Sequence, residues 1–125
     1  MPSEHWQEEP EEHDFPAAAD YLSLVATAGV AAKTVEALRS AETVHRKAKD
    51  LLRASRLELL PSANIHVRKD LEKVASGKRL SPVLLVCGRN SKDVPLTIAD
   101  GYHRICASHH IDENADVPCR LVAWP

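Results

Sequence analysis

The sequence lacks several features that mark specialised classes of protein. Its three cysteines are an odd number and lie in separate segments, which predicts reduced thiols in place of a disulfide framework. No apolar run is long enough to span a bilayer. The formal net charge is only −2, which gives no general electrostatic attraction to nucleic acid. The first residues have neither the basic nor the apolar region of a signal peptide, so we expect a cytoplasmic protein.

The remaining composition is that of a small folded protein. Apolar residues make up 44% of the chain and charged residues 27%, and 125 residues are enough for one domain with a core of its own. We divide the chain into an acidic flexible arm at 1–15, an N-terminal helical extension at 16–45, and a region of mixed helices and strands at 46–125.

The acidic arm has few residues to bury, because only Trp6 and Phe15 are large and apolar. This composition is typical of a solubilising tail. The arm is also a candidate docking segment for a basic protein partner, with Trp6 as its anchor. Its carboxylates are Glu4, Glu8, Glu9, Glu11, Glu12 and Asp14.

Helices are predicted for the segment that follows the arm. Pro16 suits a first helical turn, a helix is expected over 17–26, and Gly29 is expected to end it. A second helix is expected over about 31–53, where apolar residues recur at three- and four-residue steps. Its other face is basic, mainly over 46–53, and is either a solvated face or a phosphate-binding patch. The two helices are also candidates for a homodimer interface.

The second half of the chain alternates strands and helices. The expected elements are an extended segment at 56–61, a helix capped by Ser62 or Asn64 and running to 75, a strand at 83–87, a turn at 88–95, a strand at 96–99, a helix after Gly101, and a closing strand at 117–122. The continuous apolar run of 83–87 predicts a central strand buried on both faces, paired in a hairpin with the strand after it. Pro118 cannot donate to a ladder, which predicts an edge position for the closing strand. This order predicts a small α+β, or mixed α/β, domain.

The stretch 96–110 contains the strongest functional signal. Its apolar pattern changes from that of a strand to that of a helix at Gly101, where a glycine permits a sharp turn and the close approach of a ligand. The first amides of a helix have no partners within it, and the helix dipole favours an anion there. His103 and Arg104 add side-chain donors in the same turn. The pattern predicts a phosphate-binding turn.

This Asp-Gly-Tyr-His-Arg turn carries a resemblance to a known superfamily. Gly101, His103 and Arg104 match the Gly-Cys-His-Arg box of sulfiredoxins. Gly101, Arg104 and Ala107 fall on the spacing of the ParB box. Together with the order of strands and helices, residues 46–125 resemble the ParB/sulfiredoxin superfamily. The resemblance implies its fold, a small sheet with packed helices, and a nucleotide or another phosphate compound as ligand.

The sequence departs from this superfamily at two points. Tyr102 occupies the place of the catalytic cysteine of sulfiredoxins, so their sulfinic-acid reductase activity is not expected here. Nothing in the sequence corresponds to the helix-turn-helix and dimerisation segments of chromosome-partition ParB proteins, so DNA binding is the least favoured function. The superfamily's layout also makes Ser81 and Lys78 candidates to complete the pocket.

Each residue of the turn has a functional and a structural interpretation. Arg104 could bind a phosphate with two donors, or pair with Asp100 or with an acidic loop residue. His103 could bind the anion or carry a proton, or it could cap or pack the helix. Asp100 could orient His103, hold a magnesium ion beside a phosphate, or cap the helix, which is its simplest role. Tyr102 is a stacking surface for a base or a packing residue. We take Asp100 and His103 as candidate catalytic residues, and Gly101, Tyr102, His103 and Arg104 as candidate ligand-binding residues.

A metal site is a weaker interpretation of the same helix. His103, Cys106 and His110 fall on one helical face, but the sequence has no paired Cys-x-x-Cys of the kind found in many zinc sites. We therefore predict no metal ligands and treat Cys106 as a buried, inert thiol.

Two functions from different classes follow from these features. The first is binding of a nucleotide or other phosphate ligand, with hydrolysis or phosphoryl transfer, supported by magnesium, as its enzymatic form. The second is a non-catalytic interaction module whose arm and helices bind a protein partner. The N-terminal helices would act as a lid if they covered the turn.

Overall fold

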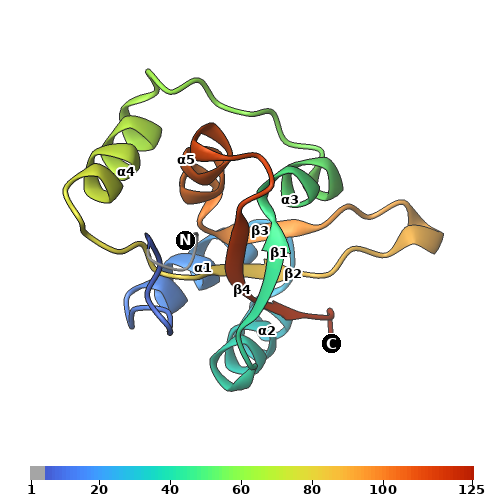
Figure 1. Cartoon of the computed structure of the whole chain (residues 1–125). Helices are drawn as coiled ribbons and strands as arrows, with labels where there is room; N and C mark the ends of the chain where they lie inside the picture. Colours follow the sequence, from blue (N-terminus) through green and yellow to red (C-terminus); the bar gives the residue numbers. More distant parts are fainter. Residues whose placement is uncertain (1–4) are drawn as a thin grey trace.

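The computed structural model describes residues 5–125 and has an α+β fold (Figure 1). A mixed sheet of four strands has helices on both faces, which confirms the fold class expected from the sequence. None of the helices in the described part has the length and apolar character needed to cross a membrane. In chain order the elements of residues 5–125 are α1 (Asp14–Leu22), α2 (Ala28–Ser40), β1 (Val44–Lys47), α3 (Ala48–Ser55), α4 (Ile65–Ala75), β2 (Val83–Val86), η2 (Asn90–Lys92), β3 (Thr97–Asp100), α5 (Tyr102–Ile111) and β4 (Asp116–Val122).

The sheet is arranged around β2. Its strands lie in the order β1, β4, β2, β3, with β2 antiparallel to β3 and parallel to β4. All of β2 is buried, so the central strand predicted from its apolar run is confirmed. The predicted hairpin of β2 and β3 is also confirmed, and it extends away from the domain with η2 near its tip (Figure 1).

The closing strand lies inside the sheet, so the edge position predicted from Pro118 was wrong. β4 pairs with β1 on one side and with β2 on the other. Pro118 lies opposite His45, one residue before the first pair with β2, which joins Val83 and Cys119. A proline is tolerated there because the parallel ladder has not yet begun at its missing N–H.

A strand interrupts the region that was predicted as one long helix. α2 ends at Ser40, and β1 and α3 follow it. Thr43 and Val44 are β-branched, which favours extended backbone, and β1 gains β4 as an antiparallel partner. The helical periodicity continued across this break by coincidence of spacing, and strand pairing outweighed it.

The extended segment at 56–61 forms no strand of the described sheet. It runs from α3 toward α4 along the edge of the molecule (Figure 1). Leu57 and Leu59 are exposed, whereas Leu60 packs partly against the core. The leucine-containing segment is therefore a linker in which only Leu60 packs against the core.

The first helix starts earlier than predicted and ends without a glycine. Pro16 lies in the first turn of α1, as expected, but the helix ends before Ser23. Gly29 lies in the first turn of α2, where Thr27 is the N-cap and accepts a hydrogen bond from the Val30 N–H at 3.2 Å. A threonine at an N-cap was the stronger boundary signal here.

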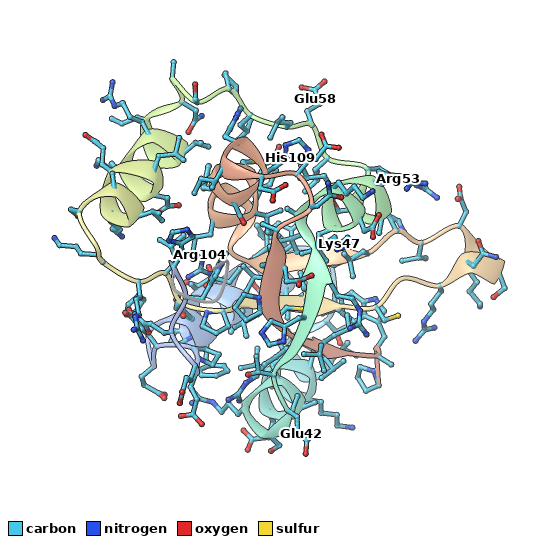
Figure 2. All side chains as sticks on the ribbon, in the orientation of Figure 1. Glu42, Lys47, Arg53, Glu58, Arg104 and His109 are labelled. Carbon is cyan, nitrogen blue, oxygen red and sulfur yellow. The ribbon has the colours of Figure 1, made fainter. Side chains whose placement is uncertain are left out.

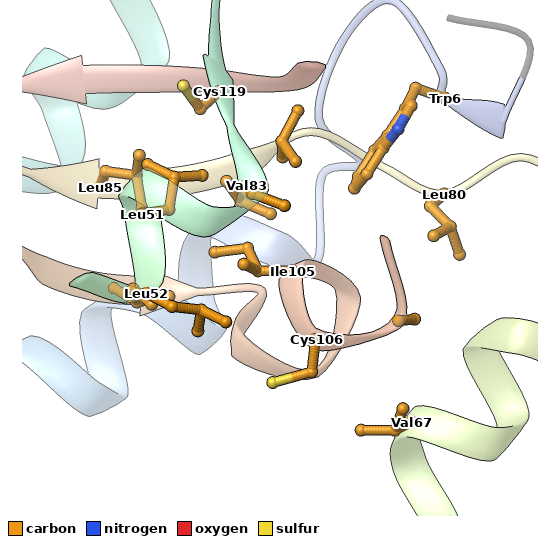
Figure 3. Close-up of a cluster of buried hydrophobic side chains, with 14 residues drawn as sticks. Trp6, Leu51, Leu52, Val67, Leu80, Val83, Leu85, Ile105, Cys106 and Cys119 are labelled. Atoms are coloured by element: carbon orange, nitrogen blue, oxygen red, sulfur yellow. The ribbon is translucent and has the colours of Figure 1, made fainter. Parts of the chain in front are cut away.

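Two apolar clusters fill the two faces of the sheet. Val83 and Leu85 of β2 belong to a cluster with α3, α4 and α5, part of which is drawn in Figure 3. Leu84 and Val86 belong to a second cluster with α1 and α2. Successive residues of β2 thus bury opposite faces, as the alternation of side chains along a strand requires.

The described part of the N-terminal region, from residue 5 onward, packs against the rest of the fold. Trp6 is only 4% exposed and shares a cluster with Leu80, with which it forms a backbone bridge (Figure 3). Phe15 and the helices after it cover the second face of the sheet. Large aromatic side chains contribute apolar burial out of proportion to their number, and a small domain uses them. Residues 1–4 of the predicted arm lie outside the described residues.

Candidate functional site

The turn between β3 and α5 positions the candidate site. Gly101 has a φ of 109°, in the region that favours glycine. A Cβ at this position would lie 2.4 Å from Cγ1 of Val83 and 2.7 Å from Nη2 of Arg104. Glycine is therefore required twice, by the backbone conformation and by the close packing of the Arg104 guanidinium.

Arg104 contacts three polar side chains from three parts of the chain. Its Nη2 donates to Oδ2 of Asp100 at 2.9 Å, and its Nη1 donates to Oγ of Ser81 and lies 3.6 Å from Oδ1 of Asp14. The side chain is 13% exposed and lies between α1, α5 and the strand ends (Figure 2). The pairing with Asp100 is thus observed, and Gly101, not Asp100, takes the N-cap position of α5. The expected capping role of Asp100 was wrong.

Two carboxylates lie side by side in this site. Asp14, buried at the start of α1, accepts a hydrogen bond from the Glu11 N–H at 2.9 Å. Burial raises the pKa of Asp100, the Arg104 guanidinium opposes this shift, and the Asp14 carboxylate adds to it. Asp100 therefore takes up a proton more readily than an exposed aspartate does.

A cleft of about 310 Å³ opens beside the turn, and α4 forms its facing wall. Four side chains of α4, here called the α4 stripe, line it at helical spacing: His66, Lys69, Asp70 and Lys73. Asn64 caps α4 by accepting from the His66 N–H at 3.0 Å, which confirms one of the two predicted caps. The first helix supplies part of the wall through Asp14 and Ala17, so it borders the cleft and is not a separate extension.

His103 joins the turn to the α4 stripe. Its ring centroid lies 4.7 Å from that of His66 and 5.6 Å from that of Tyr102. Burial lowers the pKa of His103, His66 lowers it further, and Asp70 opposes both. A pKa below the ordinary value leaves His103 neutral near pH 7, so it is able to accept a proton.

Asp70 is the acidic member of the α4 stripe. Burial raises the pKa of its carboxyl group, while Lys73, Arg104 and His103 act in the opposite direction. Its Oδ1 lies 3.9 Å from Nζ of Lys73. The cleft thus combines lysine ammonium groups, neutral imidazole and carboxyl groups with raised pKa values, a set suited to binding an anion and moving a proton.

Only some of the residues predicted for the site line the cleft. Those that line the cleft are Asp100, Gly101, His103 and Arg104. Tyr102 donates its hydroxyl to the Glu58 carbonyl and faces the other side of the turn. Ser81 contacts Arg104 but is not among the residues that line the cleft, and the described lysines that line it come from α4, not from Lys78.

The predicted basic face of 46–53 lies apart from this cleft (Figure 2). Lys47 has its Nζ 3.8 Å from Oδ1 of Asp116, and Arg53 has its Nη1 3.6 Å from Oδ1 of Asp50. Both are exposed surface pairs, so this face is the solvated one of the two alternatives.

The helical stripe considered for a metal is divided among three environments. His103 lines the cleft, Cys106 is buried in the core, and His110 donates from Nε2 to the Leu60 carbonyl at 2.7 Å. Burial raises the pKa of the Cys106 thiol, in keeping with an unreactive cysteine. Within residues 5–125, no three His, Cys, Asp or Glu side chains are grouped to hold a metal ion.

Sequence reasoning missed the residues that reach the site from α1 and α4. Asp14 stood in a run of acidic residues that resembled a tail, and the α4 stripe stood in a helix considered only for its apolar face. The available signal was the spacing of polar residues in α4, which places His66, Lys69, Asp70 and Lys73 on one face. Only the packing of α4 against α5 directs that face toward the turn.

No protein-family model, curated protein or solved structure matches the chain significantly. The resemblance to the ParB/sulfiredoxin superfamily therefore stays a prediction.

Proposed function

We propose that the chain binds a phosphate-bearing small molecule of the nucleotide class in the cleft between α4 and the first turn of α5. The observation that carries this proposal is the convergence of Lys69 and Lys73 with the amide end of α5 on one cleft. Lysines and the free amides of a helix N-terminus both favour phosphate. The resemblance of the Asp-Gly-Tyr-His-Arg turn to the ParB/sulfiredoxin superfamily supports the same ligand class.

In this proposal Arg104 holds the turn in shape, and other groups make the first contacts with the ligand. Its donors already serve Asp100 and Ser81. The side chains of Lys69 and Lys73 are exposed and line the cleft with His103, where a phosphate would approach them, and Lys73 would exchange its 3.9 Å contact with Asp70 for the ligand. A phosphate that reaches Arg104 competes with Asp100, and the raised pKa of Asp100 eases this exchange because a protonated carboxyl group holds arginine less strongly.

Turnover is the second step of the proposal. His103, neutral near pH 7, would accept the proton of an attacking water or hydroxyl, and Asp100 would return a proton to the leaving group. Magnesium would supply neutralisation of phosphate charge, and it needs only one or two carboxylates in addition to phosphate oxygens. Asp70, which also lines the cleft, has the oxygen donors that suit it.

The proposed setting is the cytoplasm. The three cysteines are free thiols, and one of them, Cys87, is exposed. Exposed free thiols persist in reducing compartments, where nucleotides are also abundant.

The test is a thermal-shift series with ATP, ADP, CTP, GTP and pyrophosphate, each with and without magnesium. A ligand that binds only the folded state raises the melting temperature with its concentration. We expect at least one of these ligands to stabilise the wild type. We expect the double variant Lys69→Gln/Lys73→Gln to lose most of that stabilisation, because it removes two cationic groups from the cleft.

A matched control is the double variant Lys33→Gln/Lys78→Gln. It removes the same charge from exposed positions that do not line the cleft among the described residues. It should keep the ligand-dependent shift of the wild type. No shift with any ligand at millimolar concentration, or equal loss in the two double variants, would contradict the proposal.

A protein-interaction module remains the second candidate. Val25 lines an apolar groove of about 350 Å³ with Trp124, and the neighbouring Leu24 is 81% exposed. Arg89 and Lys92 line the same groove, which favours a partner segment with apolar and acidic residues. The expected anchor Trp6 is buried in the chain's own core and is not available for this role.

A further inference from the structure

A second cleft lies on the other side of the Asp100–Gly101 turn. It measures about 380 Å³, and its own walls are apolar and aromatic, formed by Tyr21 of α1, Leu57 of the linker and Tyr102 of α5. Four residues line both this cleft and the cationic cleft described above: Ala17, Asp100, Gly101 and His103. The two clefts are therefore neighbours that share one wall.

The second cleft gathers aromatic surface in a protein that has little. The chain has only two tyrosines, and both line this cleft. The Tyr102 ring is held in place because its hydroxyl donates to the Glu58 carbonyl. Tyr21 is 44% exposed and Leu57 is 42% exposed, so an apolar surface on two walls of the cleft remains open to solvent. Such a surface suits the flat face of an aromatic ligand.

His103 connects the two clefts. Its ring lies between those of His66 and Tyr102, with centroid distances of 4.7 Å and 5.6 Å. A row of rings therefore runs from the cationic cleft into the apolar one. A ligand that occupies both must carry an anionic end and a flat, largely apolar end joined by a short linker.

We infer that the apolar cleft is the base-binding subsite of a nucleoside polyphosphate whose phosphates occupy the cationic cleft. This inference rests on the proposed function, and it adds the chemical class of the whole ligand and a role for Tyr21. The base stacks between Tyr21 and Tyr102 against Leu57, and the sugar crosses the shared wall at Gly101. Stacking on aromatic rings tolerates different bases, so selectivity among bases is modest.

The test compares the dissociation constants of inorganic triphosphate and of ATP, CTP, GTP and UTP, measured by isothermal titration calorimetry. For the wild type we expect nucleoside triphosphates to bind about tenfold more tightly than triphosphate, the scale of one stacked base. Tyr21→Ala should abolish this advantage and leave the affinity for triphosphate unchanged, because Tyr21 does not line the cationic cleft in the described structure. Tyr21→Phe should bind as the wild type does.

The matched control is Leu24→Ala, which removes a more exposed apolar side chain that lies outside this cleft. It should leave all the dissociation constants unchanged. Equal affinity of the wild type for triphosphate and nucleotides would overturn the base subsite while leaving phosphate binding in place. Loss of affinity for triphosphate in Tyr21→Ala would overturn it as well. Absence of binding by triphosphate and nucleotides alike would overturn the proposed function and this inference together.

Discussion

Arg104 and Arg120 are both largely buried, but they lie in two regions of the molecule and have different partners. Nη1 of Arg120 donates to the backbone carbonyls of Leu38 and Arg39, at 3.2 Å and 2.7 Å, near the end of α2. Arg104 donates to side chains, among them the carboxylate of Asp100, and lines a cleft. The last carbonyls of a helix lack partners within it, so Arg120 completes α2.

The difference lies in whether the partners can change state. Backbone carbonyls do not titrate, so the contacts of Arg120 are the same at every pH. The carboxyl group of Asp100 has a raised pKa and shares the site with Asp14 and His103. The region around Arg104 thus contains groups whose charge depends on pH, whereas the two hydrogen-bond acceptors of Arg120 are backbone carbonyls, whose charge does not.

The largest effect is expected from breaking the packing beneath Arg104. Gly101→Ala should lower the free energy of unfolding by about 4 kcal/mol, because it combines a positive φ with overpacking against Val83. Gly77→Ala is the matched control, since Gly77 has a φ of +82° but open space around its Cβ position. It should cost only about 1 kcal/mol. Urea denaturation at 25 °C measures the free energy of unfolding of both variants. Similar decreases in Gly101→Ala and Gly77→Ala would show that packing at Gly101 is unimportant.

The second prediction exchanges each arginine for methionine and follows stability with pH. At pH 7 we expect Arg104→Met to lower the free energy of unfolding by about 3 kcal/mol, because the substitution leaves buried carboxylates without their cation. Arg120→Met should lower the free energy of unfolding by about 2 kcal/mol, because it removes the two hydrogen bonds to backbone carbonyls. Without Arg104 the folded-state pKa of Asp100 rises further, and a raised pKa makes folding less favourable as pH increases. The loss in Arg104→Met should therefore shrink toward pH 4.

The loss in Arg120→Met should stay constant over the same range of pH, since its partners are backbone carbonyls. Denaturation curves recorded from pH 4 to pH 8 provide the comparison. Parallel pH profiles for the two variants would mean that the two regions do not differ as described.

The smallest effect is expected at His103. Its folded-state pKa is lowered, so the unfolded chain binds a proton more readily and stability falls as pH drops through about 6.5. His103→Asn should make the free energy of unfolding less dependent on pH between 7 and 5. His45→Asn, at an exposed position of β1, is the control and should keep the wild-type slope. An unchanged slope in His103→Asn would remove His103 from the titrating groups of the cleft.

Local signals predicted the strongest elements correctly. The run Val83 to Val86 was identified as a central strand because four apolar residues in succession suit burial on both faces. The turn at Gly101 was identified from the change of apolar period. Strand β1 was missed because the apolar spacing across Val44 is helical, and β4 was misplaced because Pro118 suggested an edge. Both signals are local, whereas the pairing of β1 with β4 joins residues far apart in the chain.

The site was predicted in part for the same reason. Asp100, Gly101, His103 and Arg104 are adjacent in sequence, so one segment placed them together. Asp14 and the α4 stripe come from distant segments, and only packing brings them to the cleft. Arg104 illustrates the limit: its type and position were evident from sequence, but its engagement by Asp14 and Ser81 was not.

By itself the sequence determined the α+β class, the hairpin, and a glycine turn that begins a helix with histidine and arginine. Each depends on contacts or conformations within a few residues, which apolar spacing and glycine report directly. The tertiary structure alone decided that the N-terminal segment joins the core, that α4 faces the turn, and that Arg104 is neutralised inside the protein. Those outcomes depend on which surfaces bury each other, a property of the whole chain that no single segment carries.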